Sequence, residues 1–192
     1  MGRRSDSKTR ILAAAQQLIE LRGYSQIGVA EICASAGVPK GSFYYFFASK
    51  DALALAVIDT QWESQKADWA RILDGEDPLR RLCEMIVSTL NSEQVTGCLY
   101  GNLALELSNE RTEAIRDRLR EIFDAQVDLI AQVTGPDTAR AVVAQIEGQI
   151  MFAKLHNDIR RLDALWPSIR VLSGEQQTVG VVDRHPPAVA RR

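Results

Sequence analysis

The chain has 192 residues, of which 46% are hydrophobic and 25% are charged, and its longest apolar run is the seven-residue segment 52–58. A globular protein without a membrane span is expected, because a membrane-spanning helix needs roughly 18 consecutive apolar residues. Three cysteines without C-x-x-C spacing support neither a disulfide framework nor a zinc ribbon, which favours the reducing cytoplasm. The formal net charge of −2 is unevenly divided, because residues 1–50 hold seven Lys/Arg against three acids. This basic first quarter is the part suited to a polyanion.

Apolar residues recur at three- and four-residue intervals along almost the whole chain, and only six prolines interrupt them, so an all-helical fold is predicted. The first helix is expected to start at a cap within 5–7 and to end at Gly23, because glycine readily takes the positive φ of a helix end. Two short helices follow over 29–35 and about 40–46, separated by the turn 36–39. A short helix, a glycine-containing turn and a second short helix are typical of a helix-turn-helix.

Longer helices are predicted for the rest of the chain. Ser49 is a good N-cap for a helix that reaches Leu73, and Pro78 opens the next helix, which reaches Leu90. The remaining predicted helices cover 98–107, the stretch from a cap at Asn109 to the boundary at Gly135-Pro136-Asp137, 137–157 and 160–172. From Gly174 the composition turns to Gln, Gly, Pro and Arg without periodicity, which predicts a disordered tail.

The helix predicted at 40–46 combines polar and aromatic side chains in a way that suits DNA. With the residue after it, its sequence is Lys40-Gly41-Ser42-Phe43-Tyr44-Tyr45-Phe46-Phe47. Phe43 and Phe47 are four residues apart and can anchor one face of the helix in the core. The side chains expected to bond phosphate oxygens or base edges are Lys40, Ser42, Tyr44 and Tyr45, with Lys50 at the start of the next helix. The alternative is that the aromatic residues belong to the core and that the lysines are simply solvated.

The order of the elements favours the first interpretation. After Gly23-Tyr24 the chain shows Val29-Ala30-Glu31-Ile32, then Ala36-Gly37-Val38-Pro39 leading into the helix at 40–46, then Ser49-Lys50-Asp51-Ala52-Leu53. Residues 7–55 thereby resemble the N-terminal domain of TetR-family transcriptional repressors. The resemblance implies a helix-turn-helix that reads a palindromic operator in double-stranded DNA, with its second helix in the major groove.

The chain departs from the commonest pattern of that family at two places. Ile27-Gly28 stands where the family often has Thr-Ser/Thr, and Pro39 stands where it often has Ser. Both changes remove hydroxyl groups that could cap helices or reach phosphate, so DNA affinity is expected to depend more on the remaining donors and on a basic N-terminal arm. The DNA-binding candidates are Arg3, Arg4, Lys40, Gly41, Ser42, Tyr44, Tyr45 and Lys50.

Beyond residue 55 the resemblance implies only an architecture, a helical ligand-binding domain whose last two long helices pair with a second copy. The residues agree with such a homodimer, because apolar stripes run along both predicted helices: Val142, Val143, Ile146 and Ile150 on one, and Leu165, Trp166, Ile169 and Leu172 on the other. The alternative is that the stripes pack on the domain's own core. The predicted domains are 1–48 for DNA binding, 49–173 for ligand binding and dimerisation, and 174–192 as the tail.

A small-molecule effector is expected to bind in the second domain and to favour a conformation in which the two recognition helices no longer match the groove spacing. The candidate ligand-binding residues are the aromatic and polarizable ones: Trp62, Trp69, Cys83, Met85, Cys98, Tyr100, Phe123 and Phe152. An ordinary core would also contain such residues.

Cys98 carries a sharper hypothesis. With Thr96 as the N-cap, Cys98 lies in the first turn of a helix, where the helix dipole lowers the pKa of a thiol and makes it reactive. The string Gly97-Cys98-Leu99 resembles that of a TetR subgroup that senses electrophiles or oxidants through the cysteine. The alternative is that Cys98 is a small buried hydrophobic residue, which is the interpretation given to Cys33 and Cys83.

No catalytic constellation is visible. The motifs G-x-S-x-G, H-E-x-x-H and G-x-G-x-x-G are missing, and the two histidines, His156 and His185, are isolated. We therefore expect neither an enzyme nor a metal site, and no cofactor. The alternative function is a helical module that binds a protein partner through its aromatic face, and salt-dependent duplex binding separates the two, since only a DNA reader loses affinity steeply with salt.

Overall fold

The computed structural model describes residues 2–90, 94–107 and 112–174, with side chains from residue 6 onward. Throughout these ranges the regular structure is helical and contains no strand, which confirms the predicted fold class. In chain order the elements are α1 Gly2–Arg22, α2 Val29–Ser35, α3 Lys40–Phe46, α4 Lys50–Leu73, α5 Pro78–Leu90, α6 Leu99–Glu106, α7 Glu113–Thr134, α8 Pro136–His156, a 3₁₀ helix Ile159–Ala164 and α9 Leu165–Leu172.

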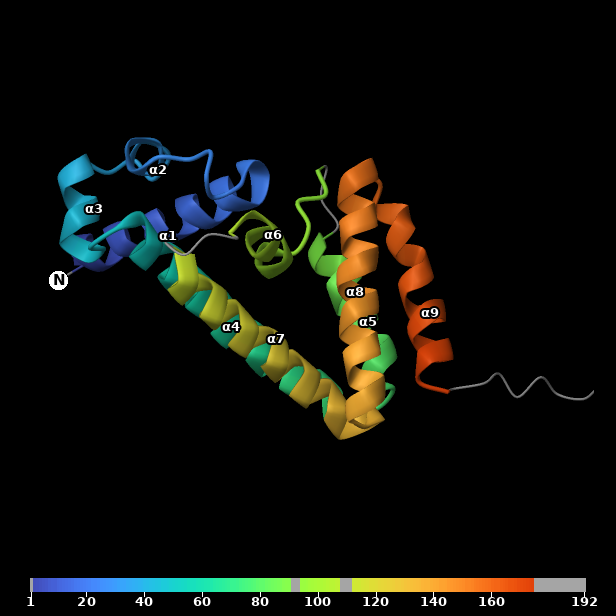
Figure 1. The fold of residues 1–192 in the computed structure, drawn as a ribbon. Coiled ribbons are helices and arrows are strands. Elements are labelled where there is room, and N and C mark those ends of the chain that lie inside the picture. The colour runs from blue at the N-terminus through green and yellow to red at the C-terminus, as the bar shows by residue number, and fades with distance from the viewer. Residues whose placement is uncertain (1, 91–93, 108–111, 175–192) are drawn as a thin grey trace, which may run out of the picture.

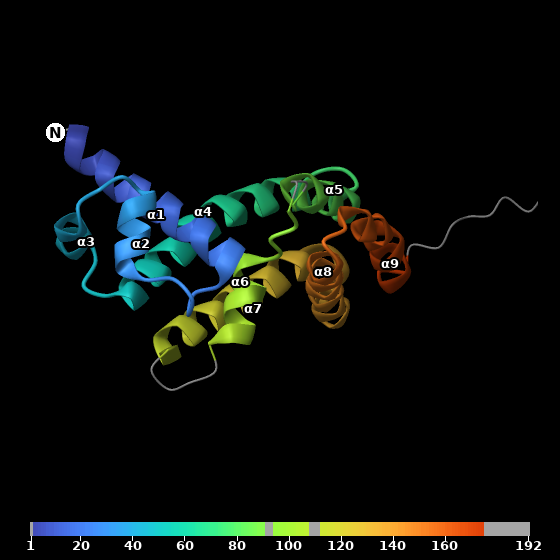
Figure 2. The same ribbon diagram turned by 90° about the horizontal axis from the view of Figure 1, so that it is seen from above.

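The helices form an elongated molecule with α3 near one end and α9 near the other (Figure 1, Figure 2). The long helices α4 and α7 pack on each other and connect the two ends, and α7 also packs on α8. The short helix α6 lies between α1 and the upper part of α8 in the view of Figure 1. Among the described helices, none combines the length and the apolar character that a bilayer crossing needs.

Local signals place most helix boundaries where the sequence predicts them. The hydroxyl of Ser49 accepts a hydrogen bond from the Ala52 N–H at 3.0 Å and caps α4. Pro78 begins α5, where its missing N–H costs nothing. Gly135 has φ of 80° and joins α7 to α8 without a spacer. These turns fold the chain back on itself and thereby set the packing partners of each long helix.

Two predicted boundaries are wrong. Helix α1 begins at Gly2 rather than at a cap within 5–7. The single helix predicted over 160–172 is divided into a 3₁₀ helix and α9. Pro167 explains the division, because a proline inside one continuous helix would remove a hydrogen bond and clash with the preceding turn. Placed in the first turn of a new helix, it does neither. The predicted cap at Asn109 and the predicted tail lie outside the described residues.

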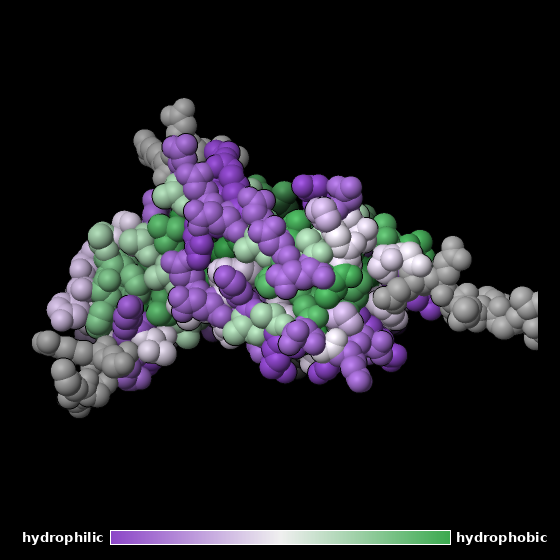
Figure 3. Space-filling view, turned by 90° about the horizontal axis from the view of Figure 1, so that it is seen from below, coloured by the Kyte–Doolittle hydropathy of each residue, from purple (hydrophilic) through white to green (hydrophobic). Residues whose placement is uncertain are grey.

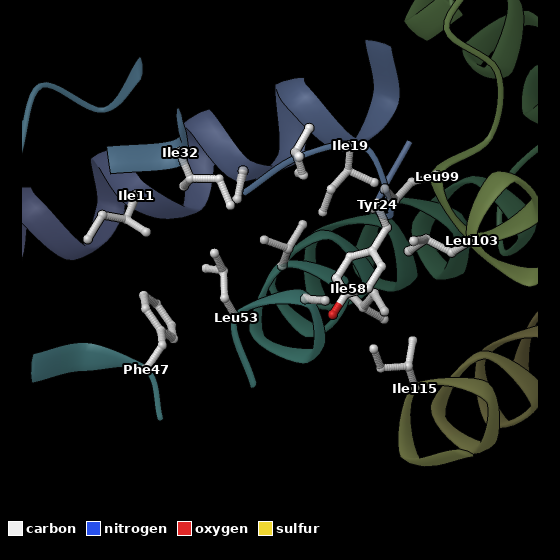
Figure 4. Packing of buried hydrophobic residues seen from close by; sticks show 14 of the residues in the cluster. Ile11, Ile19, Tyr24, Ile32, Phe47, Leu53, Ile58, Leu99, Leu103 and Ile115 are labelled. Carbon is white, nitrogen blue, oxygen red and sulfur yellow. The ribbon is translucent and has the colours of Figure 1, made fainter. Parts of the chain in front are cut away.

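The buried hydrophobic residues form two neighbouring clusters. One joins α1, α2 and α3 to the first half of α4, to α6 and to the start of α7. The other joins the end of α4 to α5, α8 and α9. Figure 4 shows how the first cluster is shared, with Tyr24 surrounded by Ile19 of α1, Ile58 of α4, Leu103 of α6 and Ile115 of α7. The helix-turn-helix therefore shares its core with the helices that follow residue 48.

The stripes predicted to face a second copy are instead largely inside this chain. Val142, Ile146 and Ile150 of α8, with Leu165 and Ile169 of α9, are buried against α5 and the end of α4. The alternative stated for these stripes is thus the correct one for those residues. Leu172 of the predicted stripe is exposed, and other apolar side chains are also exposed on the two helices: Met151, Phe152, Leu155 and Val171. Seen from below, hydrophobic side chains show on both sides of a broad hydrophilic band (Figure 3).

Candidate nucleic-acid interface and effector cavity

Helix α3 presents two sharply different faces. Phe43 and Phe47 are buried and their rings contact each other, with centroids 5.8 Å apart. Tyr44 and Tyr45 are 58% and 65% exposed. Lys40 and Gly41 are exposed and Ser42 is half-buried on the same short helix. The predicted division into an anchored face and an outward donor face is present, and it brings five of the eight DNA-binding candidates onto one short surface.

The turn before α3 is held by backbone hydrogen bonds. The Val38 N–H donates to the Cys33 carbonyl at 3.0 Å, and the Gly37 N–H donates to the Ala34 carbonyl at 3.1 Å. Gly37 has φ of 61°, a conformation that glycine adopts without steric cost. Arg10 of α1 donates to the Gly37 carbonyl at 3.4 Å. These contacts fix the direction in which α3 leaves the turn and therefore the orientation of its tyrosines.

Lys50 is not placed as a phosphate ligand. Its ammonium donates to the carbonyls of Tyr24 and Ile27, each at 3.0 Å, and lies 4.1 Å from the centre of the Tyr24 ring. Sequence patterns could not show this, because the two carbonyls are 26 and 23 residues away. Lys50 closes the turn between α1 and α2 from inside. Arg3 and Arg4, which form the predicted basic arm, lie on the helical backbone of α1.

A second link joins this turn to the rest of the molecule through Glu106, at the end of α6. Its carboxylate accepts hydrogen bonds from the backbone N–H of Tyr24, at 2.7 Å, and of Ser25. The Tyr24 hydroxyl in turn donates to the carboxylate of Asp51 on α4. Burial alone would raise the pKa of Glu106, but the donors from Ser25 and Tyr24 and the charge of Lys50 outweigh it and lower that pKa. Helix α6 is therefore tied to the start of the helix-turn-helix by a charged contact.

A cavity of about 490 Å³ opens among α1, α4, α5, α6, α7 and α8, a size within the usual range for small-molecule sites. It brings together four of the predicted ligand-binding residues, Trp69, Met85, Cys98 and Tyr100. A second hollow, of about 830 Å³, lies between the end of α1, α6 and α8 and includes Phe123. Gly97, Cys98, Glu147 and Ile150 line both spaces. Cys98 thus stands in the wall between an outer hollow and an inner cavity.

Three predicted ligand-binding residues lie elsewhere. Trp62 is buried and packs edge-to-face on Tyr100, with ring centroids 6.4 Å apart, but it does not line the cavity. Cys83 is buried in the apolar core around α5. Burial raises the pKa of its thiol to about 12, and burial also raises the pKa of Cys33. Phe152 is 49% exposed on the outside of α8.

The cavity also contains polar residues that sequence reasoning missed. Gln126 of α7 is buried and lines the cavity, as do Gln61 and Ser64 of α4 and the carboxyl of Glu147. Gln126 carried a signal that could have been used, because it occupies an apolar position in the spacing Leu119, Ile122, Gln126, Ile130. A polar residue at a core position of an amphipathic helix indicates an internal polar site.

The pKa predicted for Cys98 is wrong in direction. Cys98, and not Thr96, is the N-cap of α6, and its Sγ accepts a hydrogen bond from the Gly101 N–H at 3.5 Å. Burial and the nearby Glu147 carboxylate raise the pKa of the thiol, and the Gly101 N–H opposes them only in part. Burial raises the pKa of Glu147 as well. The two groups meet over Gly101, where a Cβ atom would lie 2.5 Å from the Glu147 Oε2.

Comparison with known proteins agrees with this geometry. Residues 11–57 match the family model of bacterial regulatory proteins of the tetR family. The chain is 33% identical over 176 residues to an uncharacterized HTH-type transcriptional regulator in the lacX 3′ region of Lactococcus lactis, covering 83% of this chain and 89% of that protein. It is 30% identical over 196 residues to the HTH-type transcriptional repressor DhaR of a Mycobacterium species, covering 90% of this chain and 98% of that protein.

The fold is similar to that of the reduced form of E. coli NemR, with a TM-score of 0.76 at 21% identity, over 86% of this chain and 96% of that one. The relatives from Lactococcus lactis and Mycobacterium are both regulators of transcription. The chain belongs to the TetR family of bacterial transcriptional regulators.

Proposed function

We propose that the protein is a ligand-responsive repressor that binds a palindromic operator as a homodimer and leaves it when a small molecule occupies the inner cavity. The observation that carries the proposal is the anchored helix α3, whose exposed tyrosines are braced by buried Phe43 and Phe47. Such a helix holds donors in a fixed array, which is what contact with base edges and phosphates in a major groove requires. The proposed domains are 1–48 for DNA binding, 49–173 for ligand binding and dimerisation, and 174–192 as the tail.

The proposed DNA contacts come from α3 and from the start of α1. Lys40 and the backbone at Gly41 reach phosphate, Ser42 and the two tyrosines reach phosphate or base edges, and Arg3 and Arg4 approach the adjacent backbone. For Lys50, the sequence predicts a phosphate contact, but we propose a supporting role, because two of its three N–H donors already hold the turn at Tyr24 and Ile27. It supports the reading helix indirectly.

A second copy of the chain is proposed to pack on the outer faces of α8 and α9. The exposed apolar side chains Met151, Phe152, Leu155 and Val171 support this placement. Leu155→Glu should convert the dimer to monomer in analytical ultracentrifugation, because a buried unpaired carboxylate is costly. Val133→Glu, at an exposed apolar position of α7, is the matched control and should leave the dimer intact. A monomeric wild type would contradict the proposal.

Helix α6 is proposed to carry the signal between the two ends. Tyr100 and Cys98 at its start line the cavity, and Glu106 at its end bonds to the turn before α2. An occupant that shifts α6 would move the turn and with it the helix-turn-helix. The ligand acts only if it binds the shifted conformation more tightly than the operator-binding one.

A covalent response at Cys98 is a second candidate, favoured by the position of this thiol between the outer hollow and the inner cavity. In such a response an activated alkene in the cavity adds to the thiol. The sulfur bonds to one alkene carbon, the π-electron pair moves toward the conjugated carbonyl oxygen, and the thiol proton passes to the neighbouring Glu147 carboxylate. The proton then passes from Glu147 to the other alkene carbon as the carbonyl re-forms, which leaves a neutral thioether adduct. Treatment with N-ethylmaleimide, followed by mass spectrometry and DNA binding, tests the candidate. Release of DNA from treated Cys98→Ser would exclude it.

The proposed function is tested by DNA binding to the region upstream of the gene that encodes the chain. Fluorescence anisotropy over a series of salt concentrations should give steep, linear salt dependence, with the slope reduced by about 1 in Lys40→Ala. Lys66→Ala, at an exposed position of α4, is the matched control and should match the wild type. Absence of duplex binding at every salt concentration would instead support the protein-interaction module that lacks DNA affinity.

A further inference from the structure

Two residues that line the inner cavity carry buried hydrogen-bond donors that have no partner among the described residues. Trp69 of α4 and Tyr100 of α6 are each 2% exposed and line the cavity. Within the described residues, neither the indole Nε1 of Trp69 nor the hydroxyl of Tyr100 makes a hydrogen bond. A buried donor without a partner costs about 1–3 kcal/mol, so such groups are uncommon in a folded protein unless they meet something that the chain itself does not supply. A ligand that supplies hydrogen-bond acceptors to these two donors would therefore be favoured.

The charges around the cavity disfavour an anionic occupant. Its lining contains the carboxyl groups of Glu20, Asp68 and Glu147, but no lysine, arginine or histidine. Glu20 accepts a hydrogen bond from Gln16 at 3.0 Å, and Asp68 pairs with Arg71 at 3.0 Å. A carboxylate or phosphate ligand would face carboxyl groups without a cation to balance it.

The remaining lining fits a mainly apolar molecule. Met85, Ile86, Leu90, Ile146 and Ile150 supply apolar surface from α5 and α8. With a volume of about 490 Å³, the cavity has room for a two-ring aromatic compound. Apolar walls with a few convergent polar groups are the usual construction of a small-molecule site.

We propose that the inner cavity binds an uncharged, largely apolar molecule whose acceptor oxygen, as in an aromatic ketone, pairs with the Trp69 indole N–H and the Tyr100 hydroxyl. This inference rests on the proposed function, because it names the chemistry of the effector for the same cavity. Trp69 and Tyr100 recognise the ligand oxygen, and the carboxyl groups of the lining exclude anions.

A matched set of naphthalene compounds tests the proposal by isothermal titration calorimetry on the full-length protein without DNA. 2-Acetylnaphthalene carries the acceptor, 2-ethylnaphthalene lacks it, and 2-naphthoate and 2-(naphthyl)ethylammonium carry a negative and a positive charge on a similar frame. The ketone should bind about tenfold or more tightly than the hydrocarbon, because one or two buried hydrogen bonds are gained. Both charged compounds should bind less tightly than the ketone, because the carboxylate meets the carboxyl groups of the lining and the ammonium group has no acceptor for the two donors.

Variants at the two donors separate recognition from a structural role. Tyr100→Phe should weaken ketone binding about 3- to 10-fold and leave the hydrocarbon within about twofold of wild type. In the unliganded protein the same variant should unfold at the wild-type temperature or above it, because an unpaired hydroxyl is removed. Trp69→Phe should also weaken ketone binding. Trp166→Phe, at a partly buried tryptophan of α9 outside the cavity lining, is the control for loss of an indole.

Three results would overturn the proposal. The first is that the ketone shows no detectable binding. The second is that naphthoate or the ammonium compound binds as tightly as the ketone. The third is that ketone affinity is unchanged in both Tyr100→Phe and Trp69→Phe. Operator binding is measured on the same samples. Intact operator binding with no ketone binding rejects this inference alone, whereas ketone binding without any DNA binding rejects the proposed repressor function and retains the site.

Discussion

The helix-turn-helix and the inner cavity treat buried polar groups in opposite ways. Around α1–α3 the phenol of Tyr24 is bonded to Asp51, and the carbonyls of Tyr24 and Ile27 are bonded to Lys50. In the cavity, Trp69 and Tyr100 each keep an unpaired donor. A surface that must match a fixed groove gains from a core that is satisfied in advance, whereas a binding cavity gains from donors that only a ligand satisfies. The helix-turn-helix is therefore suited to holding a rigid shape, and the inner cavity is suited to binding a ligand.

The largest expected effect is a loss of stability when the core of the helix-turn-helix is disrupted. Phe43→Ala should lower the free energy of unfolding by about 3–5 kcal/mol, because a fully buried ring is replaced by a cavity. Urea denaturation followed by circular dichroism measures the loss. Tyr45→Ala, two positions away on the exposed face of α3, should change stability by about 0.5 kcal/mol or less. Equal losses in the two variants would mean that α3 is not anchored as described.

The outward face of α3 should matter for DNA and not for the cavity. Tyr44→Ala should weaken operator binding by about 1–3 kcal/mol, since a donor to phosphate or base is removed. Ketone affinity in the inner cavity should stay unchanged, because the side chain is 58% exposed on α3, which does not line the cavity. Anisotropy measures the first property and calorimetry the second. A change in ketone binding without a change in DNA binding would reverse the assignment of the two regions.

Loss of the Glu106 contact, which joins helix α6 to the helix-turn-helix, should have a smaller effect on stability than loss of Phe43, and the effect should depend on pH. Glu106→Gln should lower the free energy of unfolding at pH 7 by about 1–2 kcal/mol, because charge-assisted hydrogen bonds to the Tyr24 and Ser25 N–H are lost. The folded pKa of Glu106 is lowered, so its contribution is complete above the ordinary value of 4.5 and disappears as the pH falls through the folded value.

Denaturation of wild type and Glu106→Gln at several pH values measures this difference, which should shrink below pH 4.5. Glu63→Gln, at an exposed position of α4, serves as the control. A difference that is constant down to strongly acidic pH would show that the Glu106 carboxylate does not stabilise the junction.

The smallest expected effect concerns the rate at which Cys98 reacts with a general alkylating agent. Burial and Glu147 raise the pKa of the thiol well above its ordinary value of 9.0, and only the thiolate is a strong nucleophile. Alkylation by iodoacetamide should therefore be slower at pH 7 than in an unfolded control and should continue to accelerate above pH 9. A rate that levels off below pH 8 would restore the reactive helix-terminal thiol that the sequence predicts.

Short-range signals in the sequence determined most of the helical framework. Ser49, Pro78 and Gly135 act on the few residues beside them, so the boundaries of α4, α5 and α8 can be predicted from local patterns. The same holds for α2 and α3, whose bounds match the prediction and whose buried and exposed faces follow from the spacing of Phe43 and Phe47.

Only the tertiary structure decided which residues meet across long separations. Lys50 turns inward because two carbonyls more than 20 residues away need donors. Burial, together with the Glu147 carboxylate from another helix, raises the pKa of Cys98 where the sequence predicts a lowered one. The stripe on α8 faces its own core because α5 and α9 pack there. Periodicity shows that a helix has an apolar face, but the partner of that face depends on how the whole chain folds.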